Sequence, residues 1–263
     1  MSNFVSVNRR HWDAVTPGHV ASDFYDVESF KAGRDTIDDV ESGLVGGVVG
    51  MNLLHLQCHF GLDTMSWTRR GAIATGVDFS EVAISAATGL AFDLKLNTRF
   101  RVGNVLALDL GEEFDIVFSS HGVLGWLPEL RSWARTVAKH LKPHGRFVLV
   151  DGHPVLWMFD DERSDGAMRL RYDYFSREAL AFEETGSYAD PHGPMTNTLE
   201  RLHPIEDVLG ALVTAGLTIT GFREYDQIAW QAMPHMVQDQ NGWWRLPADT
   251  PRIPLMFSVT ATR

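Results

Sequence analysis

Cysteine is almost absent from this chain of 263 residues, which carries only Cys58. A single cysteine excludes an internal disulfide framework and fits a reducing cytoplasm, where we expect the protein to reside. The sequence also lacks an apolar run long enough to cross a bilayer, and its N-terminus lacks the apolar segment of a secretory signal. We therefore expect a soluble protein with no membrane partner.

Basic residues are in the minority, since the sequence has 23 Lys and Arg but 34 Asp and Glu, which gives a formal net charge of −11. No stripe of Lys and Arg provides the electrostatic footprint of a nucleic-acid binder, so a nucleic-acid partner is disfavoured. An acidic net charge still permits a local basic pocket, and four arginines gather in one late segment. These are Arg163, Arg169, Arg171 and Arg177.

Internal repeats and low-complexity linkers are missing too, and an α/β chain of this length routinely folds as one domain. Short apolar runs alternate with helical patterns instead. We expect strands at 50–56, 73–77, 98–102, 114–119 and 146–151, separated by helices at 62–70, 80–89 and 128–141. This alternation implies right-handed crossovers and predicts a Rossmann-like, doubly wound, mostly parallel sheet.

The alternation stops after Asp151, and residues 153–203 are rich in aromatics, charges, Gly and Pro without helical periodicity. We interpret this stretch as an inserted lid. A helix over 205–213, started by Pro204 and stopped by Gly216, and strands over 217–224 and 255–261 would then complete a seven-stranded sheet. The single domain would comprise an N-terminal helical cover (1–45), a ligand-binding core (46–152), the lid (153–203) and a C-terminal part (204–263).

The loop that follows the first strand, residues 57–61, is short of glycine. Ligands of open α/β sheets bind beyond the carboxyl ends of the strands. Asp78 ends the second strand about 20 residues after this loop, which is the spacing at which a carboxylate binds the ribose hydroxyls of an adenosyl ligand. A dinucleotide loop needs three glycines, yet only Gly61 remains, and His59 crowds the place of a pyrophosphate. The pattern disfavours NAD and FAD and fits a nucleoside without phosphates; a plain turn or capping role for Asp78 is the alternative.

Five short blocks, in this order and spacing, resemble the class I S-adenosylmethionine-dependent methyltransferases, in particular the small-molecule group called type 11 or type 12. The blocks are HLQCHFG (55–61), VDFS (77–80), GNV (103–105), FDIVFSSH (114–121) and LKPHGRF (141–147). The resemblance implies S-adenosylmethionine as the cofactor of the 46–152 core, S-adenosylhomocysteine as its product, and a small molecule as the methyl acceptor.

The same resemblance implies a set of cofactor contacts. Gln57, Cys58, His59 and Gly61 would contact the methionine part, Asp78 the ribose, Phe79, Asn104 and Val105 the adenine, Ser120 and His121 the region of the sulfonium, and Tyr25 would close over the cofactor. Two features depart from the family pattern. His55 stands where an acidic residue is usual, and Gln57 and His59 replace two glycines.

Methyl transfer from a sulfonium is an in-line displacement, so the protein mainly has to align the acceptor. His121 and His153 are the candidate general bases, because each follows a central strand on the ligand side and imidazole titrates near neutral pH. His121 could instead only contact the cofactor, and His153 could satisfy backbone groups. No metal is expected, because the 11 histidines and the acidic run 160–162 lack a compact zinc-like spacing.

Aromatic side chains are abundant in the lid and in the C-terminal part. They could line an apolar acceptor pocket, attract a cationic amine, or simply seal the lid. The set comprises Trp157, Phe159, Tyr172, Tyr174, Phe175, Phe182, Tyr188, Trp230, Trp243 and Trp244, together with Met158. Two other functions stay open: a catalytically silent S-adenosylmethionine-binding protein or partner subunit, and, less favoured, an NAD-dependent oxidoreductase. The sequence identifies neither the acceptor nor the oligomeric state.

Overall fold

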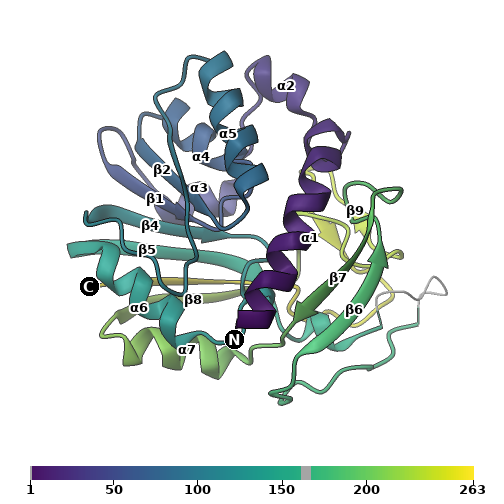
Figure 1. Cartoon of the computed structure of the whole chain (residues 1–263). Helices are drawn as coiled ribbons and strands as arrows, with labels where there is room; N and C mark the ends of the chain where they lie inside the picture. Colours follow the sequence, from purple (N-terminus) through teal and green to yellow (C-terminus); the bar gives the residue numbers. More distant parts are fainter. Residues whose placement is uncertain (1, 161–166) are drawn as a thin grey trace.

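A seven-stranded sheet organises the computed structural model, which describes residues 2–160 and 167–263 (Figure 1). Its strands are β1 (Asn52–Leu56), β2 (Ile73–Asp78), β3 (Arg99–Val102), β4 (Phe114–Ser120), β5 (Leu141–Gly152), β8 (Thr218–Tyr225) and β11 (Met256–Thr262). The strand order is β3-β2-β1-β4-β5-β11-β8, and only β11 runs antiparallel to its neighbours. The predicted mostly parallel, doubly wound sheet is confirmed, and the strand order reverses between β1 and β4.

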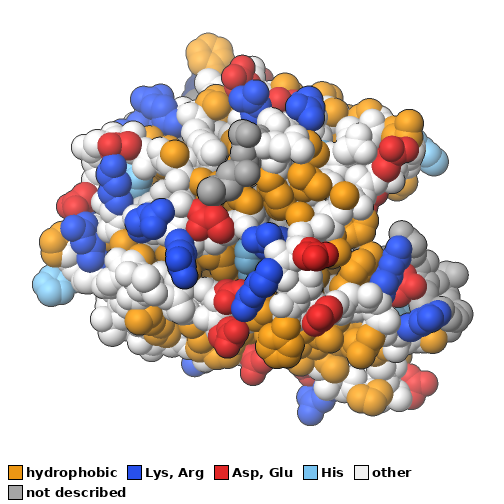
Figure 2. Space-filling model, turned by 60° about the horizontal axis from the view of Figure 1, so that its bottom comes forward, with side chains coloured by type: hydrophobic (Ala, Val, Ile, Leu, Met, Phe, Trp, Pro, Cys, Tyr) orange, Lys and Arg blue, Asp and Glu red, His pale blue; other side chains and the backbone are white. Residues whose placement is uncertain are grey.

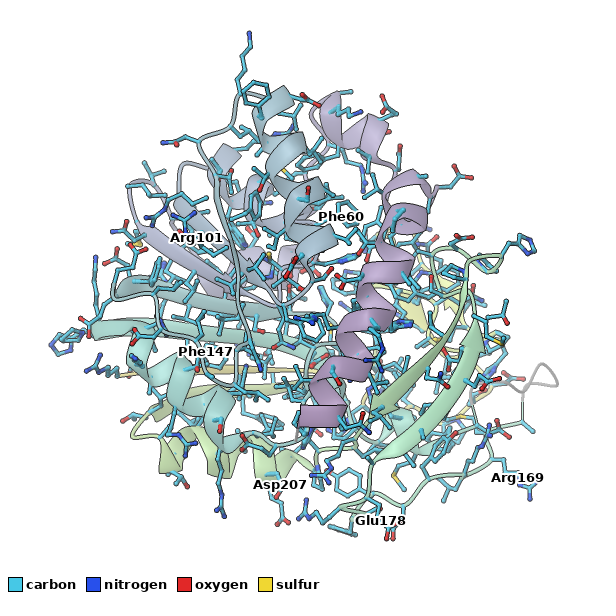
Figure 3. The ribbon with its side chains drawn as sticks, viewed as in Figure 1. Phe60, Arg101, Phe147, Arg169, Glu178 and Asp207 are labelled. Carbon is cyan, nitrogen blue, oxygen red and sulfur yellow. The ribbon has the colours of Figure 1, made fainter. Side chains whose placement is uncertain are left out.

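Four helices pack on the sheet: α4 (Leu62–Arg69), α5 (Glu81–Asp93), α6 (Arg131–His140) and α7 (Ile205–Thr214). Successive residues of a strand point to opposite faces, so a strand covered on both sides must be apolar throughout. In β1, Leu54 packs in the cluster of α6 and α7 with Trp133, whereas Leu53 packs in the opposite cluster with Trp67 of α4. Phe147 of β5 lies in the core between these layers (Figure 3).

The helix boundaries have local causes. Ser80 caps α5 by accepting a hydrogen bond from the backbone N–H of Ala83 at 3.0 Å. The N-cap of α7 is Pro204, and Gly216, with a φ of 90°, follows its C-cap. The strand β5 begins earlier than predicted, at Leu141, because the 143–145 turn is accommodated as an irregularity in its pairing with β4.

The N-terminal cover (1–45) consists of α1 (Ser2–Ala21), α2 (Val27–Lys31) and α3 (Asp39–Val45). In Figure 1, α1 lies between α5 and the hairpin of β6 (Leu180–Thr185) and β7 (Met195–Glu200). Buried Asn8 joins α1 to β7, since its side chain exchanges hydrogen bonds of 2.7 and 2.8 Å with the backbone carbonyl and N–H of Leu199.

The inserted lid contains more regular structure than expected. Besides the β6–β7 hairpin it contains a short 3₁₀ turn, η2 (Leu156–Met158), and residues 237–245 form the small pair β9 (Val237–Gln238) and β10 (Trp244–Arg245). Another 3₁₀ turn, η1 (Leu124–Trp126), follows β4. Arg169 lies at the outer edge of the lid (Figure 3).

Two of the late arginines that the structure describes form ion pairs with carboxylates. Arg171 pairs with Asp160 at 3.0 Å, and Arg177 pairs with Asp207. Arg163 and the acidic pair 161–162 lie outside the described residues. On the face drawn in Figure 2, Lys and Arg side chains are interspersed with Asp and Glu. Within the described residues, no helix combines the length and the apolar character needed to cross a membrane.

Candidate functional site

A cavity of about 1650 Å³ lies at the carboxyl ends of the parallel strands. Its walls come from the loops after β1, β2, β3, β4 and β5, from α1, and from the lid. All the residues for which a cofactor contact was expected line it: Tyr25, Gln57, Cys58, His59, Gly61, Asp78, Phe79, Asn104, Val105, Ser120 and His121. The fold therefore brings together side chains that are up to 96 positions apart in the sequence (121 − 25).

The 57–61 loop keeps a left-handed backbone at three alternating residues. The φ angles of Gln57, His59 and Gly61 are 57°, 51° and 81°. Only glycine adopts this region without cost, and a Cβ at Gly61 would also collide with the ring of Phe100. The Gln57 side chain helps to hold the loop, because its Nε2 donates to the Val123 carbonyl at 2.9 Å. The loop thus has the conformation of a glycine-rich turn while two of its residues carry long side chains.

Asp78 ends β2 with its carboxylate buried at the cavity wall. One of its oxygens accepts the N–H of His59 and the other accepts the N–H of Ser80, both at 2.9 Å. A carboxylate has about four acceptor positions, so each oxygen keeps capacity for a ligand hydroxyl. Burial raises the pKa of Asp78 to about 6, although the N–H donors act in the opposite direction. At neutral pH the group is therefore an anionic acceptor inside the cavity.

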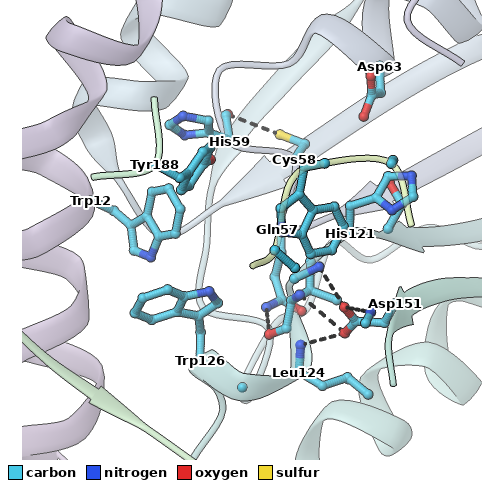
Figure 4. Close-up of a pocket in the computed structure, with 18 of the residues that line it drawn as sticks. Trp12, Gln57, Cys58, His59, Asp63, His121, Leu124, Trp126, Asp151 and Tyr188 are labelled. Atoms are coloured by element: carbon cyan, nitrogen blue, oxygen red, sulfur yellow. Dashed lines mark hydrogen bonds between the residues drawn. The ribbon is translucent and has the colours of Figure 1, made fainter. Parts of the chain in front are cut away.

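Asp151, at the end of β5, fixes the loop that follows β4 (Figure 4). Its carboxylate accepts the backbone N–H groups of Gly122 at 2.5 Å, Leu124 at 3.0 Å and Val123 at 3.2 Å. Burial raises the pKa of Asp151, and these donors oppose the shift. From the sequence, Asp151 was expected only to end a strand. An acidic residue that closes a central strand was the signal that could have indicated its role.

His121 lies against two carboxylates of the N-terminal cover. Its Nε2 is 3.3 Å from Oδ2 of Asp38 and 3.3 Å from Oε1 of Glu41, and its φ is 53°. Burial lowers the pKa of His121, but the carboxylates of Glu41 and Asp38 outweigh this effect and raise it well above 6.5. The carboxylates thus favour the positively charged form of the imidazole, and they would favour any other cation at this point as well. Asp38 and Glu41 were not anticipated from the sequence.

Another carboxyl, that of Asp63, belongs to the same region of the cavity. Burial, followed by the charge of Glu41, raises its pKa to about 7. Figure 4 shows Asp63 and His121 on the side of the pocket opposite Trp12 and Trp126. The carboxyl groups around His121 thus form the acidic end of the cavity, where Trp230 also packs edge to face on His121 with the ring centroids 5.8 Å apart.

His153 does not line the cavity. The ring is buried, its Nε2 lies 3.1 Å from Oε1 of Glu224, and its Nδ1 accepts the N–H of Val155 at 3.1 Å. Burial lowers the pKa of His153 despite the charge of Glu224. The second candidate base thus sits apart from the residues around His121.

Polar side chains connect the cofactor loop to the cover and to the lid. His19 of α1 contacts His59 Nε2 at 3.0 Å through Nδ1 and Ser187 Oγ at 2.8 Å through Nε2. The hydroxyls of Tyr25 and Tyr188 are 2.5 Å apart. Burial lowers the pKa of His19 to about 4, so the His19 imidazole in this hydrogen-bonded network is neutral at physiological pH. The N-terminal cover and the lid therefore close over the same loop.

Aromatic side chains form much of the remaining wall. Trp12 and Trp126 meet edge to face with their ring centroids 5.2 Å apart, and Trp157 stacks on Trp230 at 6.3 Å. Of the aromatic set expected to shape the acceptor pocket, the members that line the cavity are Trp157, Phe159, Tyr172, Phe182, Tyr188, Trp230, Trp243 and Trp244. Met158, Tyr174 and Phe175 do not line it.

The central part of the chain is similar to known proteins. Residues 54–149 match the family described as "Methyltransferase domain". Over 128 residues the chain is 26% identical to the ubiquinone biosynthesis O-methyltransferase of Pseudomonas fluorescens, a match that covers 47% of this chain and 55% of that protein. The chain thus spans about half the length of this curated relative.

Solved structures share the fold. An S-adenosylmethionine-dependent methyltransferase from Mesorhizobium loti is 21% identical, with a TM-score of 0.59 over 84% of this chain and 94% of that one. The glycopeptide N-methyltransferase MtfA complexed with S-adenosylmethionine is 19% identical, with a TM-score of 0.52 over 87% and 96% of the two chains. At these identities the likeness concerns the architecture.

Proposed function

We propose that the protein transfers a methyl group from S-adenosylmethionine to a small-molecule acceptor, because residues 54–149 match the methyltransferase-domain family and solved S-adenosylmethionine-dependent methyltransferases have a similar fold. The observation that carries this proposal is the buried Asp78 carboxylate, which lies at the cavity wall with acceptor capacity to spare. Its place at the end of β2, beside the reversal of strand order, is where such folds bind nucleosides.

The residues of the cavity fit this cofactor. Asp78 would accept hydrogen bonds from the ribose hydroxyls, and Phe79, Asn104 and Val105 would surround the adenine. The left-handed 57–61 loop would turn its backbone toward the methionine part, where Gln57 Oε1 is buried and lacks a hydrogen-bond partner among the described residues. Ser120, the last residue of β4, would lie in the region of the reacting sulfur.

When bound, S-adenosylmethionine supplies an electrophilic methyl group on a positively charged sulfur. The protein's own contribution would be positioning and exclusion of water, since the acceptor has to approach in line with the bond that breaks. The contacts of His19 and Tyr25, which join the cover to the cofactor loop and to the lid, would contribute both to positioning and to the exclusion of water. His153 stands outside the cavity, and Nε2 of His121 faces the carboxylates of Asp38 and Glu41, so we propose no histidine base.

Binding measurements test the proposal. Isothermal titration should give a complex with S-adenosylmethionine and with S-adenosylhomocysteine in the micromolar range. Replacement of Asp78 by Ala should weaken either complex by about 1–3 kcal/mol, because the ribose hydroxyls lose a charged acceptor. Asp109→Ala is a matched control, since Asp109 is exposed and pairs with Lys139 away from the cavity.

Two results would contradict the proposal. A folded protein that binds neither compound is not a methyltransferase of this type. Equal affinity of the wild type and Asp78→Ala would remove Asp78 from the cofactor site. Binding without methylation of any acceptor in a broad metabolite screen would favour the catalytically silent alternative.

A further inference from the structure

Three side chains with metal-binding atoms converge at the acidic end of the cavity. Oδ2 of Asp38, Oε1 of Glu41 and Nε2 of His121 all lie within 4.8 Å of one another. One imidazole and two carboxylates form a donor set that suits divalent transition metals such as Zn²⁺, Mn²⁺ and Co²⁺. We propose that Asp38, Glu41 and His121 bind one divalent transition-metal ion in the wall of the cavity.

The separations of these atoms are those of ligands around an ion. Two ligands that each bind an ion at about 2.1 Å lie about 3.0–3.4 Å apart, and both oxygens are 3.3 Å from Nε2 of His121. A charge-assisted hydrogen bond would be shorter, at about 2.7–2.9 Å. Among the described residues, neither oxygen has a hydrogen-bond partner although both atoms are buried. The Glu41 side chain is only 1% exposed, so this unpartnered oxygen points into the cluster from the protein interior.

The ligands are held in place by bonds that leave the proposed metal-binding atoms free. Asp38 and Glu41 form the capping box of α3: Asp38 Oδ1 accepts the N–H of Glu41 at 2.7 Å, and Glu41 Oε2 accepts the N–H of Asp38 at 3.1 Å. Each carboxylate is thereby fixed through one oxygen and presents the other. The backbone of His121 is fixed by its N–H, which donates to the Val150 carbonyl at 2.8 Å.

Charge favours a cation at this point. Asp63 interacts electrostatically with Asp38, Glu41 and His121, so three carboxyl groups face a single imidazole. Buried charge without compensation is costly, and a divalent ion would compensate two of these negative charges. Because Asp38 and His121 line the cavity while Glu41 lies behind them, the open positions of the ion would face the space that a small molecule occupies.

The test uses untagged full-length protein, stripped with a chelator and dialysed against Zn²⁺ or Co²⁺ alone. We expect one equivalent of metal per chain, a visible Co²⁺ absorption band, and a higher Tm of the wild type with metal. Glu41→Gln and His121→Ala should each weaken binding more than about tenfold. Glutamine can still accept the capping hydrogen bond, so Glu41→Gln should fold and keep the metal-free Tm of the wild type.

His153→Ala is the matched control, because His153 also faces a carboxylate, that of Glu224, but outside the cavity. It should retain one equivalent of metal. Binding of clearly less than one equivalent by the wild type overturns the proposal, as does binding that both Glu41→Gln and His121→Ala retain in full. The readouts need neither methyl donor nor turnover, so failure here leaves the proposed methyl transfer untouched.

Discussion

The left-handed residue Gln57 allows the backbone cost of the cofactor loop to be measured. Its φ of 57° is a conformation that costs a non-glycine residue about 1–2 kcal/mol. Gln57→Ala and Gln57→Gly both remove the hydrogen bond to the Val123 carbonyl, so the difference between them isolates the backbone. Glycine relieves this strain, but it also increases the conformational entropy of the unfolded chain, which destabilises the folded protein by about 0.4–1 kcal/mol relative to alanine. The glycine variant should therefore be the more stable of the two by about 0.5–1 kcal/mol.

Urea denaturation, followed by circular dichroism, measures this difference. With equal m-values, the midpoint of Gln57→Gly should exceed that of Gln57→Ala by a few tenths of a molar. Gly89 in α5 supplies the control, because no atom lies within 4 Å of an added Cβ and its φ is not left-handed. There, alanine should be the more stable residue by about 0.5–1 kcal/mol. If alanine equals or exceeds glycine at both positions, the strain argument is refuted.

Four further expectations follow from the structure. Burial raises the pKa of Asp78 from 3.8 to about 6, and the ribose hydroxyls would bind the ionised form of its carboxyl. The affinity for S-adenosylhomocysteine should therefore fall up to tenfold per pH unit below about pH 6. Titrations across pH 5–8 should show this dependence in the wild type and not in Asp78→Asn. Since the folded protein binds the extra proton, the same shift should lower the stability of the free protein as pH rises from about 4 to 6. Asn8→Ala should lower the free energy of unfolding in urea by about 1–3 kcal/mol, because the half-buried backbone N–H and carbonyl of Leu199 lose their partners; an unchanged midpoint would contradict that role. Asp151→Ala should raise the hydrogen-exchange rates of the amides at 122–124, and unchanged rates would show that another contact orders this loop.

The sheet could be predicted from the sequence because its signals are local. The central parallel strands β1 and β4 are largely buried on both faces and read as short apolar runs, and Ser80 and Pro204 stand at the beginnings of helices. Asp78 could be found because its distance along the chain from the first strand is set by one βαβ unit. The strands of the lid lacked such a signal, since their exposed faces admit polar residues.

The acidic end of the cavity could not be predicted, because it depends on how distant segments dock. Asp38 and Glu41 precede His121 by 83 and 80 positions, and only the packing of α3 beside the loop after β4 brings them together. His153 shows the opposite case. Its position after a central strand suggested the ligand side, but its N–H bonds the Leu255 carbonyl, next to β11, and its ring turns toward Glu224 of β8.

The 57–61 loop shows that a glycine motif can lose its residues and keep its conformation. Gln57 and His59 retain left-handed backbone angles, and each adds a contact that glycine cannot make. Gln57 binds the loop after β4, while His59 binds His19 and thereby reaches Ser187 of the lid. These contacts offset part of the backbone strain, which a glycine loop would avoid. The substitutions therefore couple the cofactor loop to the cover and the lid, so that closure of the cavity and the shape of the loop stabilise each other.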